Sequence, residues 1–209
     1  MNRFFNPENF LWQWFAHLAD YFILSCLWVL CSIPVLTLGA ASIALYDTVA
    51  HCVRGKEQAM FARFFRTFKA ELGRGAVLTL VWTAVAAVLN FGYQIFAQIA
   101  AGNEILNLLS IALFMLLLIP LGVACWVIAI ESRFTHSLGS LHRTAVIFTF
   151  VHLPSTLAIT ALFIVTLNFV RFIPFLVMFL PGMMVSFQSF FIERVFIKYI
   201  PAPVSEATE

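Results

Sequence analysis

Two long apolar runs separated by only three residues constrain the fold of this chain more than any other feature. Residues 75–101 and 105–130 are each long enough to cross the hydrocarbon core of a bilayer as a helix. Only Gly102, Asn103 and Glu104 separate them. Such a short connection forces an antiparallel pair of helices. We therefore expect an all-α fold organised as a polytopic transmembrane helical bundle.

The composition supports the same fold class. Hydrophobic residues make up 62% of the chain and charged residues 11%, and the mean hydropathy is +0.97. Soluble proteins average about 25% charged residues. The net charge of +2 is small and its cations are localised, so we expect the lipid bilayer as a partner and no nucleic acid. Residues 1–200 are predicted to form a single integral membrane domain, and residues 201–209 a disordered tail.

Three further apolar runs extend the hairpin to about five proline-kinked spans. The predicted spans are residues 20–46, 75–101, 105–130, 144–170 and 172–191. Kinks are expected where prolines interrupt the runs, at Pro34, Pro120, Pro154 and Pro181. The first run also carries small residues that allow helices to approach closely: Gly39, Ala40, Ala41, Ser42 and Ala44.

The distribution of cations predicts the orientation of the bundle. With five spans, ten of the 12 Lys and Arg residues fall on one side of the membrane. The side with the excess is cytoplasmic by the positive-inside rule. This places the N-terminus outside the cell and the C-terminus on the cytoplasmic side of the membrane. The run that contains Pro34 leaves an alternative open, because a re-entrant first run would put the N-terminus inside.

The densest cluster of positive charge lies in a segment with helical amphipathicity, residues 58–73. Wound as a helix, the segment separates its aromatic side chains from its cations: Phe61, Phe64, Phe65 and Phe68 against Arg63, Arg66 and Lys69. Phenylalanines alone would equally suit a helix packed on a core, but the flanking spans favour a helix in the membrane plane. Two roles remain open for this helix: a cytoplasmic membrane-interface anchor or a docking site for a partner.

Polar residues within the spans mark a possible pocket in the outer half of the bundle. The five-span topology brings the following residues there: Asp20, Asn90, Gln94, Gln98, Asn107, Asn168 and Arg171. Amides and charges beside aromatic rings suit a sugar-like ligand, whereas the alternative is that they clamp helices together by hydrogen bonds. We further expect Asp20 to pair with Arg171.

The sequence offers no catalytic, cofactor-binding or metal-binding set of residues. It contains no GxSxG motif, no P-loop and no HExxH motif. The four cysteines lie in or beside apolar runs, where cysteine behaves as a small hydrophobe. Three carboxylates at the inner ends of spans, Asp47, Glu131 and Glu193, are expected to be solvated helix ends. We therefore expect a protein that is not an enzyme and carries no cofactor.

Several stretches resemble the YesL family of bacterial integral membrane proteins. The resemblance lies in FFNPENFLWQWF, in LADYFILSCLWVLCSIPVLTLGAASIALYDT, and in VRGKE followed by FARFFRTFKAEL, within roughly the first 75 residues. The family has no established biochemical activity and no defined catalytic residues. Its genes often lie near those for carbohydrate uptake and polysaccharide breakdown, which implies a role alongside sugar import.

Together these features predict a non-enzymatic membrane protein that is an accessory component of carbohydrate uptake or utilisation. Its expected partners are the lipid bilayer and the permease subunits of a carbohydrate ABC importer. The alternative is a stand-alone transporter or channel for a small solute. An odd number of spans does not divide into the two equal inverted halves of many transporters. A membrane enzyme acting on lipid or glycan is a third hypothesis, for which the sequence names no residue.

Overall fold

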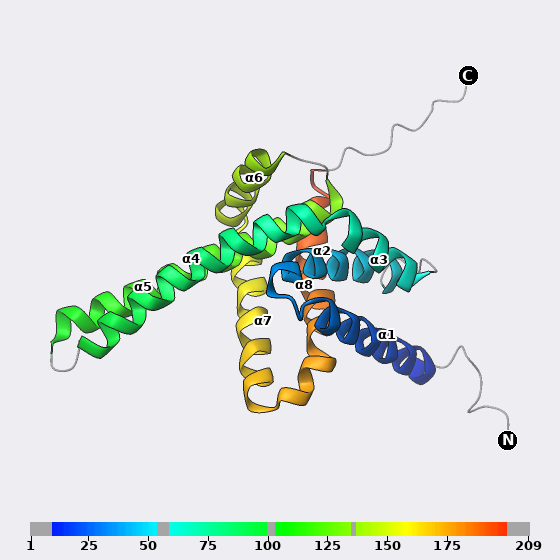
Figure 1. Ribbon diagram of the computed structural model, residues 1–209, viewed down its shortest axis with the longest axis horizontal. Helices are drawn as coiled ribbons and strands as arrows, with labels where there is room; N and C mark the ends of the chain where they lie inside the picture. The colour runs from blue at the N-terminus through cyan, green and yellow to red at the C-terminus, as the bar shows by residue number, and fades with distance from the viewer. Residues whose placement is uncertain (1–9, 54–58, 100–102, 135–136, 200–209) are drawn as a thin grey trace.

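The computed structural model describes residues 10–53, 59–99, 103–134 and 137–199, which form eight α-helices and three short helical turns (Figure 1). The prediction of an all-α fold is confirmed. The predicted disordered tail, residues 201–209, lies outside the described residues.

The first apolar run forms two helices where one kinked span is expected. Helix α1 (Phe10–Cys31) ends before Pro34, whose extended backbone cannot continue the helix. The chain then forms the 3-10 turn η1 (Val35–Thr37), helix α2 (Leu38–Thr48) and the π-helical turn η2 (Val49–Val53). Near the break, Trp28 Nε1 of α1 donates a hydrogen bond to Ser42 Oγ of α2 at 3.1 Å. The proline thus allows α2 to pack against the end of α1.

The next three helices contain the predicted amphipathic segment and hairpin. Helix α3 (Met60–Ala70) leads directly into α4 (Leu72–Ile99), and α5 (Glu104–Arg133) runs back beside α4. The two long helices project from the rest of the molecule as an antiparallel hairpin (Figure 1). The side chain of Asn103 caps α5 by accepting a hydrogen bond from the backbone N–H of Ile105 at 3.0 Å. The hairpin prediction is confirmed.

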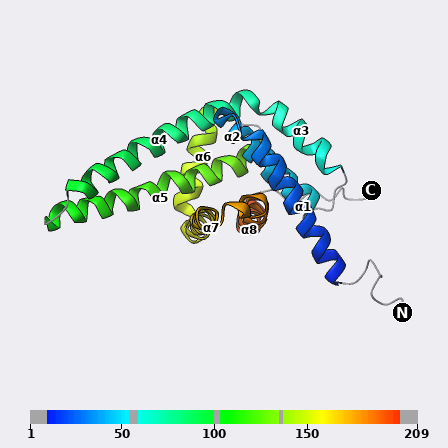
Figure 2. The same cartoon turned by 60° about the horizontal axis from the view of Figure 1, so that its bottom comes forward.

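The C-terminal part forms a second hairpin that points away from the first. Helix α6 (Leu138–Val151) is separated at His152 from α7 (Leu153–Phe172), so the predicted span 144–170 is divided just before Pro154. The 3-10 turn η3 (Pro174–Met178) then leads into α8 (Leu180–Phe196), which begins with Pro181 in its first turn. Figure 2 shows α7 and α8 side by side and nearly end-on, with α4 and α5 extending to one side.

Four helical segments of the described residues are long and apolar enough to cross a membrane, where the sequence analysis expects five spans. They are Val35–Val53, Leu72–Ile99, Glu104–Arg133 and Leu153–Phe172, and Leu18–Cys31 is a shorter apolar helix. These lengths are consistent with a membrane protein.

Helix α2 lies at the centre of the core, where it contacts α3, α4, α5 and α8. Its small residues allow a close crossing with α4, because a Cβ atom on Gly39 or Gly75 would collide with the facing backbone. Thr79 Oγ1 of α4 joins the two helices: it accepts a hydrogen bond from Gly39 N and donates one to Gly75 O, each at 2.8 Å. The close helix contact predicted from the small residues is confirmed.

Candidate functional site

The C-terminal end of α2 carries a buried carboxylate that fixes α3 in place. Asp47 is only 4% exposed. Arg63 of α3 donates two hydrogen bonds to it, from Nε to Oδ2 and from Nη2 to Oδ1, each at 2.9 Å. Thr67, one turn further along α3, donates from Oγ1 to Oδ2 at 2.8 Å. A bidentate pair of this kind is strong and directional, so it holds α3 against α2 in one orientation.

His51 extends this contact toward α5. Its Nδ1 lies 2.9 Å from the backbone oxygen of Asp47 and 3.0 Å from Asp47 Oδ1, and its Nε2 lies 3.0 Å from Arg133 Nη1. Arginine can only donate hydrogen bonds, so Nε2 must accept and the ring proton must be on Nδ1. The geometry therefore assigns the neutral tautomer with hydrogen on Nδ1.

Arg133 in turn connects α5 to α8. Its Nη2 lies 2.8 Å from Glu193 Oε1, and Tyr46 donates a hydrogen bond to the same oxygen at 3.4 Å. We call the connected residues the polar network: Tyr46, Asp47, His51, Arg63, Thr67, Arg133 and Glu193. It ties α2, α3, α5 and α8 together. Its two carboxylates are balanced by two guanidinium groups, which suits a structural clamp.

The segment that the sequence identifies as amphipathic faces two environments. Phe64 is fully buried and stacks on Phe68, with ring centroids 6.3 Å apart. Phe61 and Phe65 remain 51% and 40% exposed. Arg66 and Lys69 are also exposed and lie on this outward side of the helix. We call Phe61, Phe65, Arg66 and Lys69 the exposed edge of α3.

Arg63 does not share a face with Arg66 and Lys69 as the sequence analysis predicts. It turns toward α2 because the buried Asp47 requires a compensating charge. Likewise, two of the carboxylates expected at solvated helix ends are buried, Asp47 at 4% and Glu131 at 6% exposure. For Asp47, the feature of the sequence that points to this site is His51, which follows four residues later on the same helix face. Without a known fold, nothing in the sequence pairs Asp47 with Arg63.

The residues of the predicted outer pocket lie in separate parts of the structure. On α4, Gln94 donates a hydrogen bond to Asn90 at 2.7 Å, and Gln98 is exposed one turn further along. On α7, Asn168 donates to Ile164 O of its own helix, and Arg171 is exposed in the last turn. Asp20 lies on α1, and no ion pair joins it to Arg171 among the described residues.

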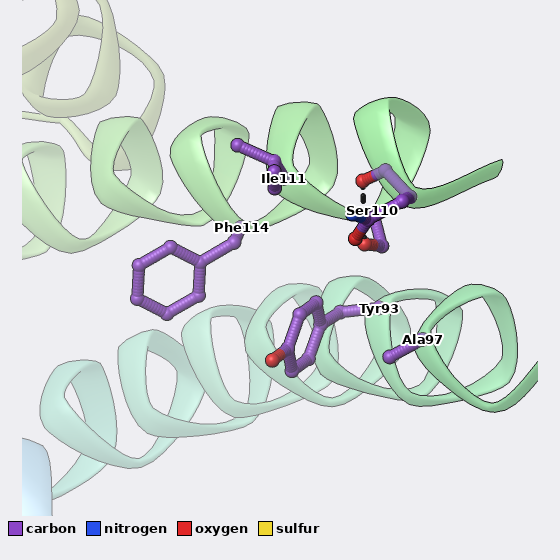
Figure 3. A pocket seen from close by; sticks show the side chains of 6 residues that line it. Tyr93, Ala97, Ser110, Ile111 and Phe114 are labelled. Atoms are coloured by element: carbon purple, nitrogen blue, oxygen red, sulfur yellow. Dashed lines mark hydrogen bonds between the residues drawn. The ribbon is translucent and has the colours of Figure 1, made fainter. Parts of the chain in front are cut away.

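One predicted pocket residue, Asn107, does line a cavity between α4 and α5 (Figure 3). The cavity has a volume of about 270 Å³ and is lined by Tyr93, Ala97, Asn107, Ser110, Ile111 and Phe114. The rings of Tyr93 and Phe114 contact each other in a tilted arrangement, with 5.7 Å between centroids. Its volume lies just below the range of about 300–1,000 Å³ typical of ligand pockets. It combines an aromatic pair with an amide and a hydroxyl group.

The described residues contain no group of three His, Cys, Asp or Glu side chains that could hold a metal ion. The four cysteines are free thiols, and only Cys125 is buried.

Comparison with known families gives one match. Residues 21–93 match a family model described as "Protein of unknown function, DUF624". The matched segment covers about a third of the chain, from within α1 to well into the second half of α4, and so includes α2, α3 and the Asp47–Arg63 contact. Searches of curated proteins and of solved structures found no match. The similarity therefore links this segment to an uncharacterised family and does not indicate a biochemical activity.

Proposed function

We propose that this protein is a non-enzymatic accessory component of the bacterial cell membrane. In this proposal the exposed edge of α3 lies at the cytoplasmic surface of that membrane. The observation that carries the proposal is the division of α3 into two sides. Arg63 and Thr67 hold the helix on the buried Asp47, while Phe61 and Phe65 stay exposed. A helix held in a fixed orientation with rings and cations outward suits an interface with lipid head groups or with a partner.

The proposed partners are the permease subunits of a carbohydrate ABC importer. This part of the proposal is supported by the resemblance to the YesL family, whose genes often accompany carbohydrate uptake systems. The cytoplasmic placement is supported by the excess of Lys and Arg on the side of α3.

The test compares two double variants with the same change of charge. Arg66→Gln with Lys69→Gln alters the exposed edge of α3, and Arg143→Gln with Lys198→Gln removes two exposed cations elsewhere. Each protein is purified from native membranes in mild detergent, and the permease subunits of carbohydrate importers are quantified by mass spectrometry. We expect the permease to be lost from the first variant and retained by the second, with both inserted normally. Equal recovery from both variants, or a wild type that purifies alone, would contradict the proposal.

A second candidate function is a stand-alone transporter or channel for a small solute. The observation in its favour is the cavity between α4 and α5, which Tyr93, Asn107 and Phe114 help to line. Solute flux into vesicles reconstituted with the wild type, and its loss in Asn107→Leu, would favour this function over the accessory role.

A further inference from the structure

The face of α4 that packs against α2 continues along the helix beyond this crossing. At the crossing, Gly75 and Thr79 meet α2 closely, and Thr79 Oγ1 accepts a hydrogen bond from Gly39 N at 2.8 Å. Small and polar side chains then recur every three or four residues, the spacing that keeps them on one face of a helix. We call this continuation the amide face of α4: Thr83, Ala86, Ala87, Asn90, Gln94 and Gln98. All six residues are exposed.

A different side of α4 is also exposed and has a different composition. It carries large aliphatic side chains at the same helical spacing: Val81, Val85, Val88, Ile95 and Ile99. Helix α4 is one of the segments long and apolar enough to cross a membrane. In a membrane, aliphatic side chains suit contact with lipid tails, whereas small residues and amides are typical of contacts between helices. The two exposed sides of α4 therefore suit different surroundings.

The amides of Asn90 and Gln94 lie well inside α4 and have unused hydrogen-bonding groups. Asn90 precedes the last residue of the helix, Ile99, by nine positions, or about 14 Å along the axis. Gln94 Nε2 donates a hydrogen bond to Asn90 Oδ1 at 2.7 Å. Within the described part of the chain, this is the one hydrogen bond that these two amides form. The amino group of Asn90 and the carbonyl oxygen of Gln94 therefore still need partners, which hydrocarbon does not supply.

We propose that the amide face of α4 packs within the membrane against the amide face of a second copy of this chain. The bonded amides of Asn90 and Gln94 leave a donor on one residue and an acceptor on the other, so each copy offers the group that the other lacks. The small side chains of Ala86 and Ala87 allow close approach, as Gly75 does at the crossing with α2. The amide face thus continues, between chains, a contact that the chain already makes within itself.

Depth in the membrane favours a second copy over a different protein. Copies of one chain insert in the same orientation, because the same distribution of cations orients each of them. A pair related by a two-fold axis along the membrane normal then brings each amide opposite its counterpart at the same depth. An unrelated helix would need its own amides at matching depths. The pairing is also separate from the proposed contact of α3, because the amides lie in the second half of α4.

Cysteine cross-linking in native membranes tests which side of α4 meets the second copy. The four native cysteines are replaced by alanine, and Ala87→Cys on the amide face is compared with Val88→Cys on the aliphatic side. Both positions are exposed and adjacent in the helix, so they lie at nearly the same depth. We expect copper phenanthroline to convert Ala87→Cys into a disulfide-linked dimer of twice the monomer mass and to leave Val88→Cys monomeric. Both variants keep Asn90 and Gln94 intact.

The contribution of the amides is measured by Förster transfer between fluorescently labelled copies in lipid vesicles, over a series of protein-to-lipid ratios. The double variant Asn90→Leu with Gln94→Leu should weaken association about tenfold, because hydrogen bonds between the helices are lost. Asn168→Leu is the control, since it removes an exposed amide from α7 that bonds within its own helix. It should leave association unchanged.

Four results would overturn the proposal. Energy transfer no higher than that of randomly distributed chains would show that the protein is monomeric. Equal cross-linking of Ala87→Cys and Val88→Cys would show that copies meet without preference for the amide face. Unchanged association of the Asn90→Leu, Gln94→Leu variant would show that the amides do not hold the copies together. A cross-linked product of Ala87→Cys with a mass other than twice the monomer would assign the face to a different protein.

Discussion

A buried carboxylate at position 47 is tolerable only because an arginine reaches it from a different helix. Burying an ion without a partner costs several kcal/mol, and a buried pair recovers that cost when its geometry is good and its remaining lone pairs are occupied. Asp47 meets these conditions, with two hydrogen bonds from Arg63 and one from Thr67. The single residue Arg63 thereby determines which side of α3 faces the protein.

We predict that Arg63→Gln destabilises the fold strongly, whereas Arg66→Gln leaves its stability nearly unchanged. Removing one partner of a buried pair costs about 3–5 kcal/mol, while a change at an exposed cation stays within about 0.5 kcal/mol. Denaturant unfolding in detergent micelles measures both. The double variant Asp47→Asn with Arg63→Gln should recover much of the loss, because no unpaired charge remains. Equal stability of the two single variants would contradict the structural role of Arg63.

A second residue-scale prediction concerns His152, which lies between α6 and α7. Its Nε2 is 3.0 Å from Tyr199 Oη, and its ring stacks on Phe148. Burial lowers the pKa of His152 below its ordinary value of 6.5, and Lys198 lowers it further. Because the pKa is lower in the folded state, protonation favours unfolding. The contribution to stability is complete above pH 6.5 and is lost as the pH falls through the folded-state pKa.

Unfolding curves recorded at pH 7.5 and at pH 5 measure this loss. We expect His152→Gln to remove this part of the pH dependence. Tyr199→Phe should retain it, because burial and Lys198 cause the shift and the hydroxyl group does not. A wild type and a His152→Gln variant with the same pH dependence would contradict the assignment.

At the scale of elements, the crossing of α2 and α4 depends on two glycines that leave no space for a side chain. We predict that Gly75→Ala destabilises the protein by about 1–3 kcal/mol, because the new methyl group meets the backbone of Ala40 and forces the helices apart. Gly73→Ala is the matched control, two residues away on the same helix, with no atom within 4 Å of the added Cβ. It should stabilise the helix by about 0.5–1 kcal/mol. Changes of opposite sign in the free energy of unfolding would support the close crossing. A Gly75→Ala variant as stable as the wild type would contradict it.

How well each element can be predicted from the sequence depends on the range of the interactions that form it. The α4–α5 hairpin follows from local features, namely two long apolar runs and a three-residue connection, and the structure agrees. The prolines also act locally, but their effect depends on surroundings that the sequence does not reveal. Pro34 separates two helices, whereas Pro120 lies inside the continuous helix α5. A kink and a complete break therefore look alike in the sequence.

The candidate site shows the same limit more sharply. Helical periodicity correctly identified α3 and its mixture of rings and cations. It could not show that Arg63 contacts Asp47, because that contact joins two helices across residues whose spacing carries no periodic signal. The same holds for Glu131, whose partner Arg74 lies far away in the sequence. Charge pairs between residues that are far apart in the sequence can be assigned only when the fold is known.

At the scale of the whole molecule, the two hairpins leave large apolar surfaces exposed, which is consistent with a membrane protein. Near the connection between α4 and α5, Val88, Ile105 and Leu108 are 72%, 78% and 71% exposed. The polar network and the exposed edge of α3 lie toward the other end of this hairpin, around the end of α5. The molecule thus has an apolar end and a charged end, which is the asymmetry that sets orientation in a membrane.

This asymmetry gives a prediction for intact cells. Single cysteines are introduced at Glu104 and at Arg66, in a chain whose four native cysteines are replaced by alanine. Both sites are exposed, and they lie at opposite ends of α4, because Glu104 begins α5 and Arg66 lies on α3. If the excess of Lys and Arg faces the cytoplasm, a membrane-impermeant maleimide should label Glu104→Cys from outside. It should reach Arg66→Cys only after the cells are permeabilised. The reverse pattern would place α3 outside, where no cytoplasmic partner could reach its exposed edge, and labelling of both sites would show that α4 does not cross the bilayer.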